Sequence, residues 1–265
     1  MIIRLLVSFA ILGSMLEAPA SADDGVLRVS APHAIIGLVR TIAESFGTSQ
    51  ALRVDVTERS SNAVAAALKA GEVDVAVSDS IPSGETTISD TPVAAVPFAL
   101  IANTASGIDS VSSARVKAFF ERTAGSWKDA GGADVPVTTI ERPKRSATEV
   151  LLERIFSLDP ARRGPDEVQD ASSSVVTDVR AMRGAIGVVG LPFAGDLSGV
   201  TVLKVDGAAP STPNIATHAY ALVAYEHALT LSGSTLSVSR FVAFLRTQTD
   251  TWRKAGFIPM RDVLR

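Results

Sequence analysis

The sequence predicts an α/β fold of two lobes, each a mostly parallel sheet flanked by helices, joined by two crossover segments. Two observations predict it. From residue 26 onwards, short apolar runs rich in β-branched residues alternate with amphipathic helical patterns. A longer apolar run, Val93–Ala102, contains Pro97, which suits a strand that bends while it passes between domains. We place the first crossing near Ala99–Asn103.

The N-terminus predicts a secretory signal peptide over residues 1–22. A short positive segment is followed by the apolar run Leu5–Leu16 and by the small residues Ala20-Ser21-Ala22. Cleavage is expected after Ala22, which places the protein in the periplasm. A retained membrane anchor is the alternative, but Glu17 and Pro19 interrupt the run, and a spanning helix needs about 20 apolar residues.

Composition excludes several function classes. The 265 residues include no cysteine, which rules out disulfides, thiolate metal sites, a cysteine nucleophile and a lipid on cysteine. The net charge is −3 and no Lys/Arg run is present, so the basic surface that nucleic-acid binding requires is missing. We identify no metal site and no cofactor motif, and we expect any anion site to be local.

Lobe 1 is expected to be discontinuous, with residues 23–100 and 194–265. Apolar residues of the first predicted helix recur at i, i+3, i+4 and i+7, which gives that helix one buried face. Gly71 suits the left-handed position that ends the second helix. The predicted elements are strands Leu27–Val29, Leu52–Val56 and Val73–Val77, helices Ile35–Phe46 and Asn62–Ala70, later strands near Val200–Val205 and Ala219–Ala224, and a last helix Thr235–Arg246.

Lobe 2 is expected to comprise residues 101–193. Its elements are predicted from the helical spacing of apolar residues and from short apolar runs typical of strands. They are helix Ser112–Arg122, strand Val135–Ile140, helices Ser146–Phe156 and Ser174–Met182, and strand Ala185–Val189. The polar, Gly/Pro-rich connections 159–170 and 206–214 are interpreted as surface loops.

The segment between Ile140 and Thr148 has the features of an anion site. A β-branched strand stops, Arg142 follows, and Ser146 stands where it can cap the next helix. The first N–H groups of a helix lack intrahelical partners, so hydroxyls and a guanidinium beside them can surround a tetrahedral oxyanion. Taken alone, the segment favours an ordinary serine cap with a solvated arginine nearby.

Polar residues also follow three other predicted strands. They are His33, Ser61 and the pair Ser78-Asp79. In open α/β sheets, ligands bind at the carboxyl ends of the strands, so these residues are expected to gather around one site.

Several motifs follow one another in order along the chain. They are Ser61-Asn62-Ala63 with the following segment Ala70-Gly71-Glu72-Val73-Asp74-Val75-Ala76, Ser78-Asp79, the segment FERTAGSWKDAGG with Trp127 and Asp129, Arg142-x-x-x-Ser146-x-Thr148, the strand GAIGVVG from Gly184, and Lys254-Ala255-Gly256-Phe257-Ile258-Pro259. This ordered series resembles the periplasmic phosphate-binding proteins of ABC transporters, which have the two-lobed type II substrate-binding fold and an anion loop of pattern "RxxGSGT". The resemblance covers nearly all of the chain after the signal peptide.

The resemblance implies inorganic phosphate as ligand, a membrane ABC permease as partner, and a monomer. It implies that Ser61, Ser146 and Thr148 donate hydroxyl hydrogen bonds to phosphate, that backbone N–H groups around Ala147 add to these, and that Arg142 supplies the charge. Asp79 would accept a hydrogen bond from the P–OH group that phosphate keeps near neutral pH. Sulfate has no such proton, so it would leave that carboxylate facing negative oxygens, at a cost of several kcal/mol.

The chain departs from the family's pattern at two places. Arg145 and Ala147 replace glycines of the anion loop, and Pro32-His33-Ala34 replaces serine or threonine donors at the first junction. His33 is therefore a further candidate ligand through its ring N–H, against the alternative of a capping or packing histidine. These departures keep open another oxyanion as ligand, or a phosphate sensor or partner-binding protein without a transport role.

A phosphate-ester hydrolase is disfavoured. The chain has no HExxH, GxSxG or Walker motif, and its three histidines are His33, His218 and His227. None of them has the sequence context of a general base for Ser61 or Ser146. The sequence thus favours a binding protein over an enzyme.

Overall fold

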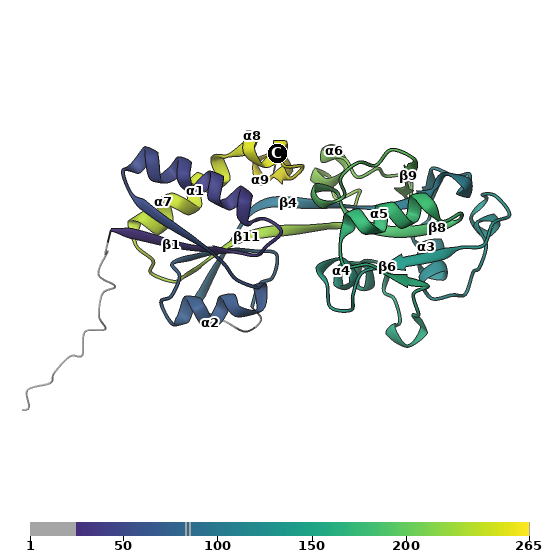
Figure 1. Cartoon of the computed structure of the whole chain (residues 1–265), viewed down its shortest axis with the longest axis horizontal. Coiled ribbons are helices and arrows are strands. Elements are labelled where there is room, and N and C mark those ends of the chain that lie inside the picture. Colours follow the sequence, from purple (N-terminus) through teal and green to yellow (C-terminus); the bar gives the residue numbers. More distant parts are fainter. Residues whose placement is uncertain (1–24, 83, 85, 265) are drawn as a thin grey trace, which may run out of the picture.

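A computed structural model describes residues 25–82, 84 and 86–264 of the chain. The predicted signal peptide, residues 1–22, lies outside the described residues. Two α/β units lie side by side, and the long strands β4 (Ile88–Asn103) and β11 (Val223–Leu231) run between them (Figure 1). Within the described residues, no helix combines the length and apolar character needed to cross a bilayer.

The first unit is a mixed sheet in the order β2-β1-β3-β11-β4. β1 (Val26–Ala31) pairs in parallel with β2 (Arg53–Glu58) and β3 (Val75–Ser78), and β11 is antiparallel to both β3 and β4. Its helices are α1 (Ile36–Gln50), η1 (Ser61–Ala63), α2 (Val64–Lys69) and α7 (Leu236–Thr247). Gly71 adopts φ +66° just beyond α2, as the sequence predicts for a helix end.

The second unit is the sheet β4-β8-β6-β7, with β9 also paired to β4. β6 is parallel to β8 and β7, whereas β8 and β9 are antiparallel to β4. The elements are β6 (Thr138–Glu141), β7 (Glu167–Val168), β8 (Ala185–Gly190), β9 (Val200–Val202), α3 (Ser113–Phe120), α4 (Ala147–Phe156) and α5 (Ser172–Ala181).

Two of the sequence motifs in this unit, the segment around Trp127 and the strand that follows Gly184, contact each other directly. The indole N–H of buried Trp127 donates to the carbonyl of Gly184 at 2.8 Å. Gly184 has φ +78°, and a Cβ there would meet the carbonyl oxygen of Pro136 at 2.1 Å. Only glycine therefore fits at the start of β8, which explains why a glycine opens that motif.

The chain changes units within β4. Residues up to Pro97 pair with β11, and Phe98 to Ala102 pair with β8. The crossing thus begins just before the predicted position, at the proline. β9 pairs with Ile101–Asn103 and β10 (Lys204–Val205) pairs with β5 (Ser110–Val111), both beside the second unit, and the lobe boundary at residue 194 stays a prediction.

The predicted strand over residues 219–224 is wrong by several residues. The observed strand, β11, begins at Val223 and continues to Leu231. Its polar residues Tyr225, Glu226 and His227 interrupt the apolar run, and the register shifts between Glu226 and His227. The extra residue at this shift is Val93 of β4, and on β11 the three successive polar residues hide the regular alternation that marks a strand in a sequence.

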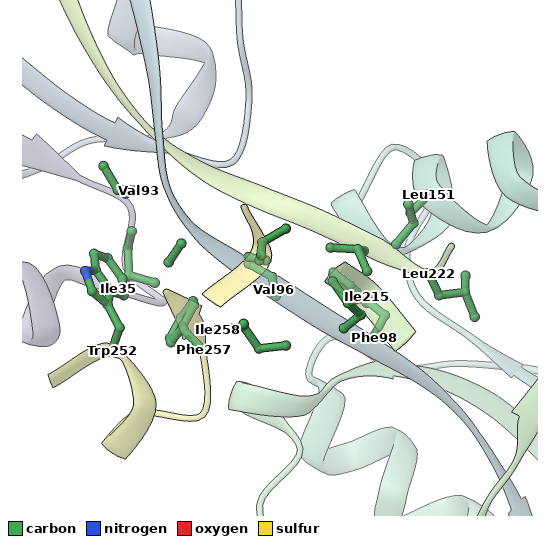
Figure 2. Packing of buried hydrophobic residues seen from close by; sticks show 14 of the residues in the cluster. Ile35, Val93, Val96, Phe98, Leu151, Ile215, Leu222, Trp252, Phe257 and Ile258 are labelled. Carbon is green, nitrogen blue, oxygen red and sulfur yellow. The ribbon is translucent and has the colours of Figure 1, made fainter. Parts of the chain in front are cut away.

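The joint between the units is packed with apolar side chains. Figure 2 shows Val96 and Phe98 of β4 among residues from both ends of the chain, with Trp252 and Phe257 close to Ile258. Phe257 makes edge contacts with Trp252 and Phe193, with ring centroids 5.3 and 5.8 Å apart. Phe257 of the Gly-Phe-Ile-Pro motif therefore packs the C-terminal part of the described chain against the segment that follows β8.

Short elements complete the fold. They are η2 (Thr104–Ser106), η3 (Trp127–Ala130), η4 (Pro160–Arg162), η5 (Leu191–Phe193), α6 (Thr212–Ala216), α8 (Thr249–Lys254), β12 (Ile258–Pro259) and α9 (Met260–Val263).

Candidate functional site

A cavity of about 400 Å³ is lined by residues of both units. The structure brings all seven predicted site residues to its wall: His33, Ser61, Asp79, Arg142, Ser146, Ala147 and Thr148. They follow β1, β2, β3 and β6, as the strand-end argument predicts. The remaining wall combines polar and apolar side chains, namely Pro32, Ala34, Ile35, Val96, Phe98, Asp170, Ala171, Ser172, Phe193, Ala224 and Glu226.

The N-terminus of α4 forms one side of the cavity. Ser146 is its N-cap, and its hydroxyl accepts a hydrogen bond of 3.3 Å from the backbone N–H of Glu149. Ala147 is exposed and Thr148 is buried at the start of the helix. The unpaired N–H groups of this first turn, with the positive end of the helix dipole, favour an anion beside them.

Arg142 supplies the positive side chain of the cavity. Its backbone N–H donates to Oε1 of Glu149 at 3.0 Å, which fixes the loop against the helix. Its side-chain Nε and Nη1 are buried and make no hydrogen bond to any described residue. Burial lowers the pKa of this guanidinium, with Asp170 and Glu149 acting in the opposite direction. Two donors in the plane of one guanidinium can reach two oxygens of one anion.

The loop between Arg142 and Ser146 contains a residue in a strained conformation. Arg145 adopts φ +72°, in the left-handed region that glycine enters without steric conflict. The backbone therefore follows the path that a glycine would take, although the side chain is an exposed arginine. The loop therefore makes a left-handed turn at a residue that carries a side chain.

Ser61 and Asp79 meet on the opposite side, in the first unit. The hydroxyl of Ser61 donates to Oδ1 of Asp79 at 2.9 Å. Asp79 follows β3 directly and is exposed to the cavity. The pair presents a hydroxyl and a carboxylate to whatever fills the cavity.

His33 lines the rim of the cavity. Its side chain is 90% exposed, and Nδ1 lies 3.3 Å from Oε1 of Glu58. This ion-pair partner directs the ring toward the end of β2. A role for His33 as an anion ligand stays a prediction.

A buried charge network supports the Arg142 loop. The guanidinium of Arg163, whose side chain is 6% exposed, contacts Glu141, Glu149 at 2.5 Å and Glu153 at 2.9 Å. Burial, with the neighbouring charge of Glu149, raises the pKa of Glu141 to about 7, although Arg163 opposes this shift. One arginine thus holds β6 and α4 together directly behind the loop.

The sequence missed two groups of lining residues. Asp170, Ala171 and Ser172 lie where α5 begins, two residues before the predicted helix start at Ser174. Glu226 comes from β11 beyond the predicted strand. Its side chain is 3% exposed, and burial together with the charge of Asp79 raises its pKa to about 8. A strand prediction extended past the polar triplet would have found it.

Two lobes are joined by two long strands, and a cavity between them is lined by Arg142 and by polar side chains. This arrangement defines a two-lobed solute-binding fold. Residues 17–247 match the family described as a PBP superfamily domain, and the chain belongs to that family.

Individual relatives agree with this assignment. The phosphate-binding protein PstS of Bacillus subtilis (strain 168) is 30% identical over 177 residues, which is 66% of this chain and 58% of that protein. The aligned part of the chain thus spans somewhat over half of this relative's length.

Among solved structures, an ABC-type phosphate transport receptor from Vibrio cholerae is similar with a TM-score of 0.72 at 22% identity, covering 88% of this chain and 99% of that one. PstS from Borrelia burgdorferi gives a TM-score of 0.73 at 16% identity, covering 89% and 99%. These similarities establish the two-lobed α/β fold predicted from the sequence.

Proposed function

We propose that this chain is a periplasmic solute-binding protein that binds inorganic phosphate in the cavity between its lobes and delivers it to an ABC transporter. One observation carries the proposal: the half-buried guanidinium of Arg142, with two buried nitrogens that have no partner among the described residues, lines the same cavity as the Ser61–Asp79 pair and the start of α4. The names of the similar proteins from Bacillus subtilis and Vibrio cholerae support the same ligand.

Each site residue has a distinct role in this proposal. Arg142 binds two oxygens of the anion, and the hydroxyls of Ser61, Ser146 and Thr148 donate to the others together with N–H groups near Ala147. Asp79 accepts the remaining P–OH hydrogen. Because a fully deprotonated oxyanion offers no such hydrogen, the ionised carboxylate would repel it, and the site discriminates against sulfate.

Calorimetry with phosphate and with sulfate on the purified protein tests this proposal. We expect phosphate binding, with sulfate at least about 100-fold weaker, since sulfate offers Asp79 no hydrogen to accept and sets negative oxygens against its carboxylate. Asp79→Asn should weaken phosphate binding and narrow the gap to sulfate at least about tenfold. Asp134→Asn, an exposed carboxylate in the second unit, is the matched control and should leave both affinities unchanged. Equal affinity of the unaltered protein for both anions would reject phosphate selectivity.

Export and delivery are separate parts of the proposal. Export requires removal of residues 1–22, and mass spectrometry of the periplasmic protein should find an N-terminus at Asp23. Delivery requires that the phosphate-loaded monomer stimulate ATP hydrolysis by its permease in proteoliposomes. A phosphatase assay with and without added metal separates this function from a hydrolase, for which we expect no turnover.

A further inference from the structure

Glu226 is a carboxyl group at the cavity that the phosphate site described above does not use. It lines the cavity together with Ala224, two residues earlier on β11, as expected when alternate residues of a strand share a face. The register shift between Glu226 and His227 occurs at this point of the strand. β-bulges redirect side chains and are common beside binding sites.

The surroundings of Glu226 give it little to bind. Its side chain is 3% exposed, and Oε2 is buried without a hydrogen-bond partner among the described residues. Its strand neighbours on β4 are apolar, with Ala94 directly opposite. A buried polar atom without a partner costs roughly 1–3 kcal/mol, so the fold retains Glu226 at the expense of stability unless something else satisfies it.

Charged groups on the elements packed around Glu226 set the electrostatic environment of its carboxyl group. Asp79 follows β3, and its negative charge adds to the effect of burial in raising the pKa of Glu226 to about 8. His227 on the same strand is paired with Asp90 of β4, and Glu149 of α4 is engaged with Arg163. The other charged groups of these elements and of the cavity wall are Lys69 of α2, Glu153 and Arg154 of α4, Arg142, Asp170 and His33.

We propose that Glu226 is a second carboxyl group of the ligand site. As a neutral acid, it donates a hydrogen bond to one oxygen of the bound phosphate, while Asp79 accepts a hydrogen bond from a P–OH group. This inference rests on the proposed function. The two carboxyls then play opposite parts: the exposed one accepts and the buried one donates. Ionisation of Glu226 would place two negative carboxylates against the anion and remove a donor, so binding should weaken at alkaline pH.

The test compares phosphate affinities of the unaltered protein and of Glu226→Gln by calorimetry between pH 6.5 and 9. Glutamine has the shape of glutamic acid and keeps an N–H donor, but it does not ionise. Between pH 6.5 and 9 the affinity of the unaltered protein should fall about tenfold relative to that of Glu226→Gln, because about one molecule in ten keeps the proton of Glu226 at pH 9. The ligand's own titration affects both proteins equally and cancels in the ratio.

Parallel pH profiles for the two proteins would overturn the inference and leave the proposed function standing. If the unaltered protein binds no phosphate at pH 6.5, the proposed function itself fails. Glu226→Met provides a second comparison without any donor, and it should bind phosphate at least about tenfold more weakly at pH 6.5.

A measurement on the unaltered protein needs no variant. At pH 9, calorimetry in buffers of different ionisation enthalpy should show proton uptake when phosphate binds, because the ionised Glu226 must regain its hydrogen. Absence of proton uptake would overturn the inference.

Discussion

The hydroxyl of Ser61 donates a hydrogen bond of 2.9 Å to Oδ1 of Asp79, so two of the proposed phosphate ligands, which follow β2 and β3 on either side of β1, also bind each other. This contact orients the carboxylate, and it leaves Oδ2 available to accept a hydrogen from the ligand. Ser61 therefore has a positioning role as well as any direct role toward the anion.

Replacing Ser61 by alanine removes both roles. We expect Ser61→Ala to weaken phosphate binding about tenfold, equivalent to roughly 1.4 kcal/mol, a usual value for a hydrogen bond to a charged group. Selectivity against sulfate should also fall, because Asp79 loses its orienting partner. Calorimetry with both anions measures this. The control is Ser239→Ala, an exposed serine on α7, which should leave binding unaltered. An unchanged affinity for Ser61→Ala would place this hydroxyl outside the binding contacts.

Arg145 offers a test of backbone strain in the loop between Arg142 and Ser146. A non-glycine residue at φ +72° costs about 1–2 kcal/mol, and glycine removes that strain while adding about 0.5–1 kcal/mol of unfolded-state entropy. We expect Arg145→Gly to raise the free energy of unfolding by about 0.5–1 kcal/mol in urea titrations. Arg145→Ala keeps the strain and should give no such gain. A loss of stability in the glycine variant would show that the arginine side chain makes a compensating contribution.

The Arg163 network predicts a large effect on stability away from the cavity wall. Arg163→Ala would leave the buried carboxylates of Glu141 and Glu149 without their common partner. Breaking a buried ion pair in this way typically lowers stability by about 3–5 kcal/mol. Thermal and urea unfolding measure this loss. Arg162→Ala, which removes an exposed neighbour, should change stability by less than about 0.5 kcal/mol. Comparable effects for the two variants would contradict a structural role for Arg163.

Residues of the anion loop could be predicted from the sequence because their signals are local. A strand that stops, a capping serine and an amphipathic helix occupy one continuous segment from residue 138 to 156, and each is visible without knowledge of the fold. Ser61 and Asp79 required one further rule, that strand ends gather at one edge of a sheet. The resemblance to phosphate-binding proteins supplied the roles of these residues, since a capped helix alone does not identify its ligand.

Glu226 and Asp170 could not be found in the same way. Glu226 lies within a run of three polar residues, Tyr225 to His227, which hides the alternation that marks strands. Asp170 ends a polar connection whose course depends on contacts of Arg163 and Asp166 with distant segments, such as the 2.7 Å bond from the N–H of Thr139 to Asp166. The pairing of β9 with β4 could not be predicted for a related reason, because it joins residues about a hundred positions apart.

The pH dependence of stability gives a test of Glu226 that needs no ligand. Its pKa is about 8 in the folded protein, against about 4.3 for an exposed glutamate. A raised pKa means that the folded state binds the proton more tightly. Its contribution to stability is therefore complete below about pH 4 and is lost as the pH rises toward 8. Glu141, with a pKa of about 7, acts in the same direction over an overlapping range.

Comparison with Glu226→Gln isolates the contribution of this one group. Glutamine does not titrate, so the unaltered protein should lose stability relative to the variant by roughly 1.4 kcal/mol per pH unit between pH 5 and 8, with no further change above about pH 9. Urea unfolding of both proteins at each pH, without phosphate, measures the difference. Glu141 is present in both and cancels. A constant difference across this range would mean that Glu226 is already ionised at pH 5, and the acid could not then serve as a hydrogen-bond donor to an anion at neutral pH.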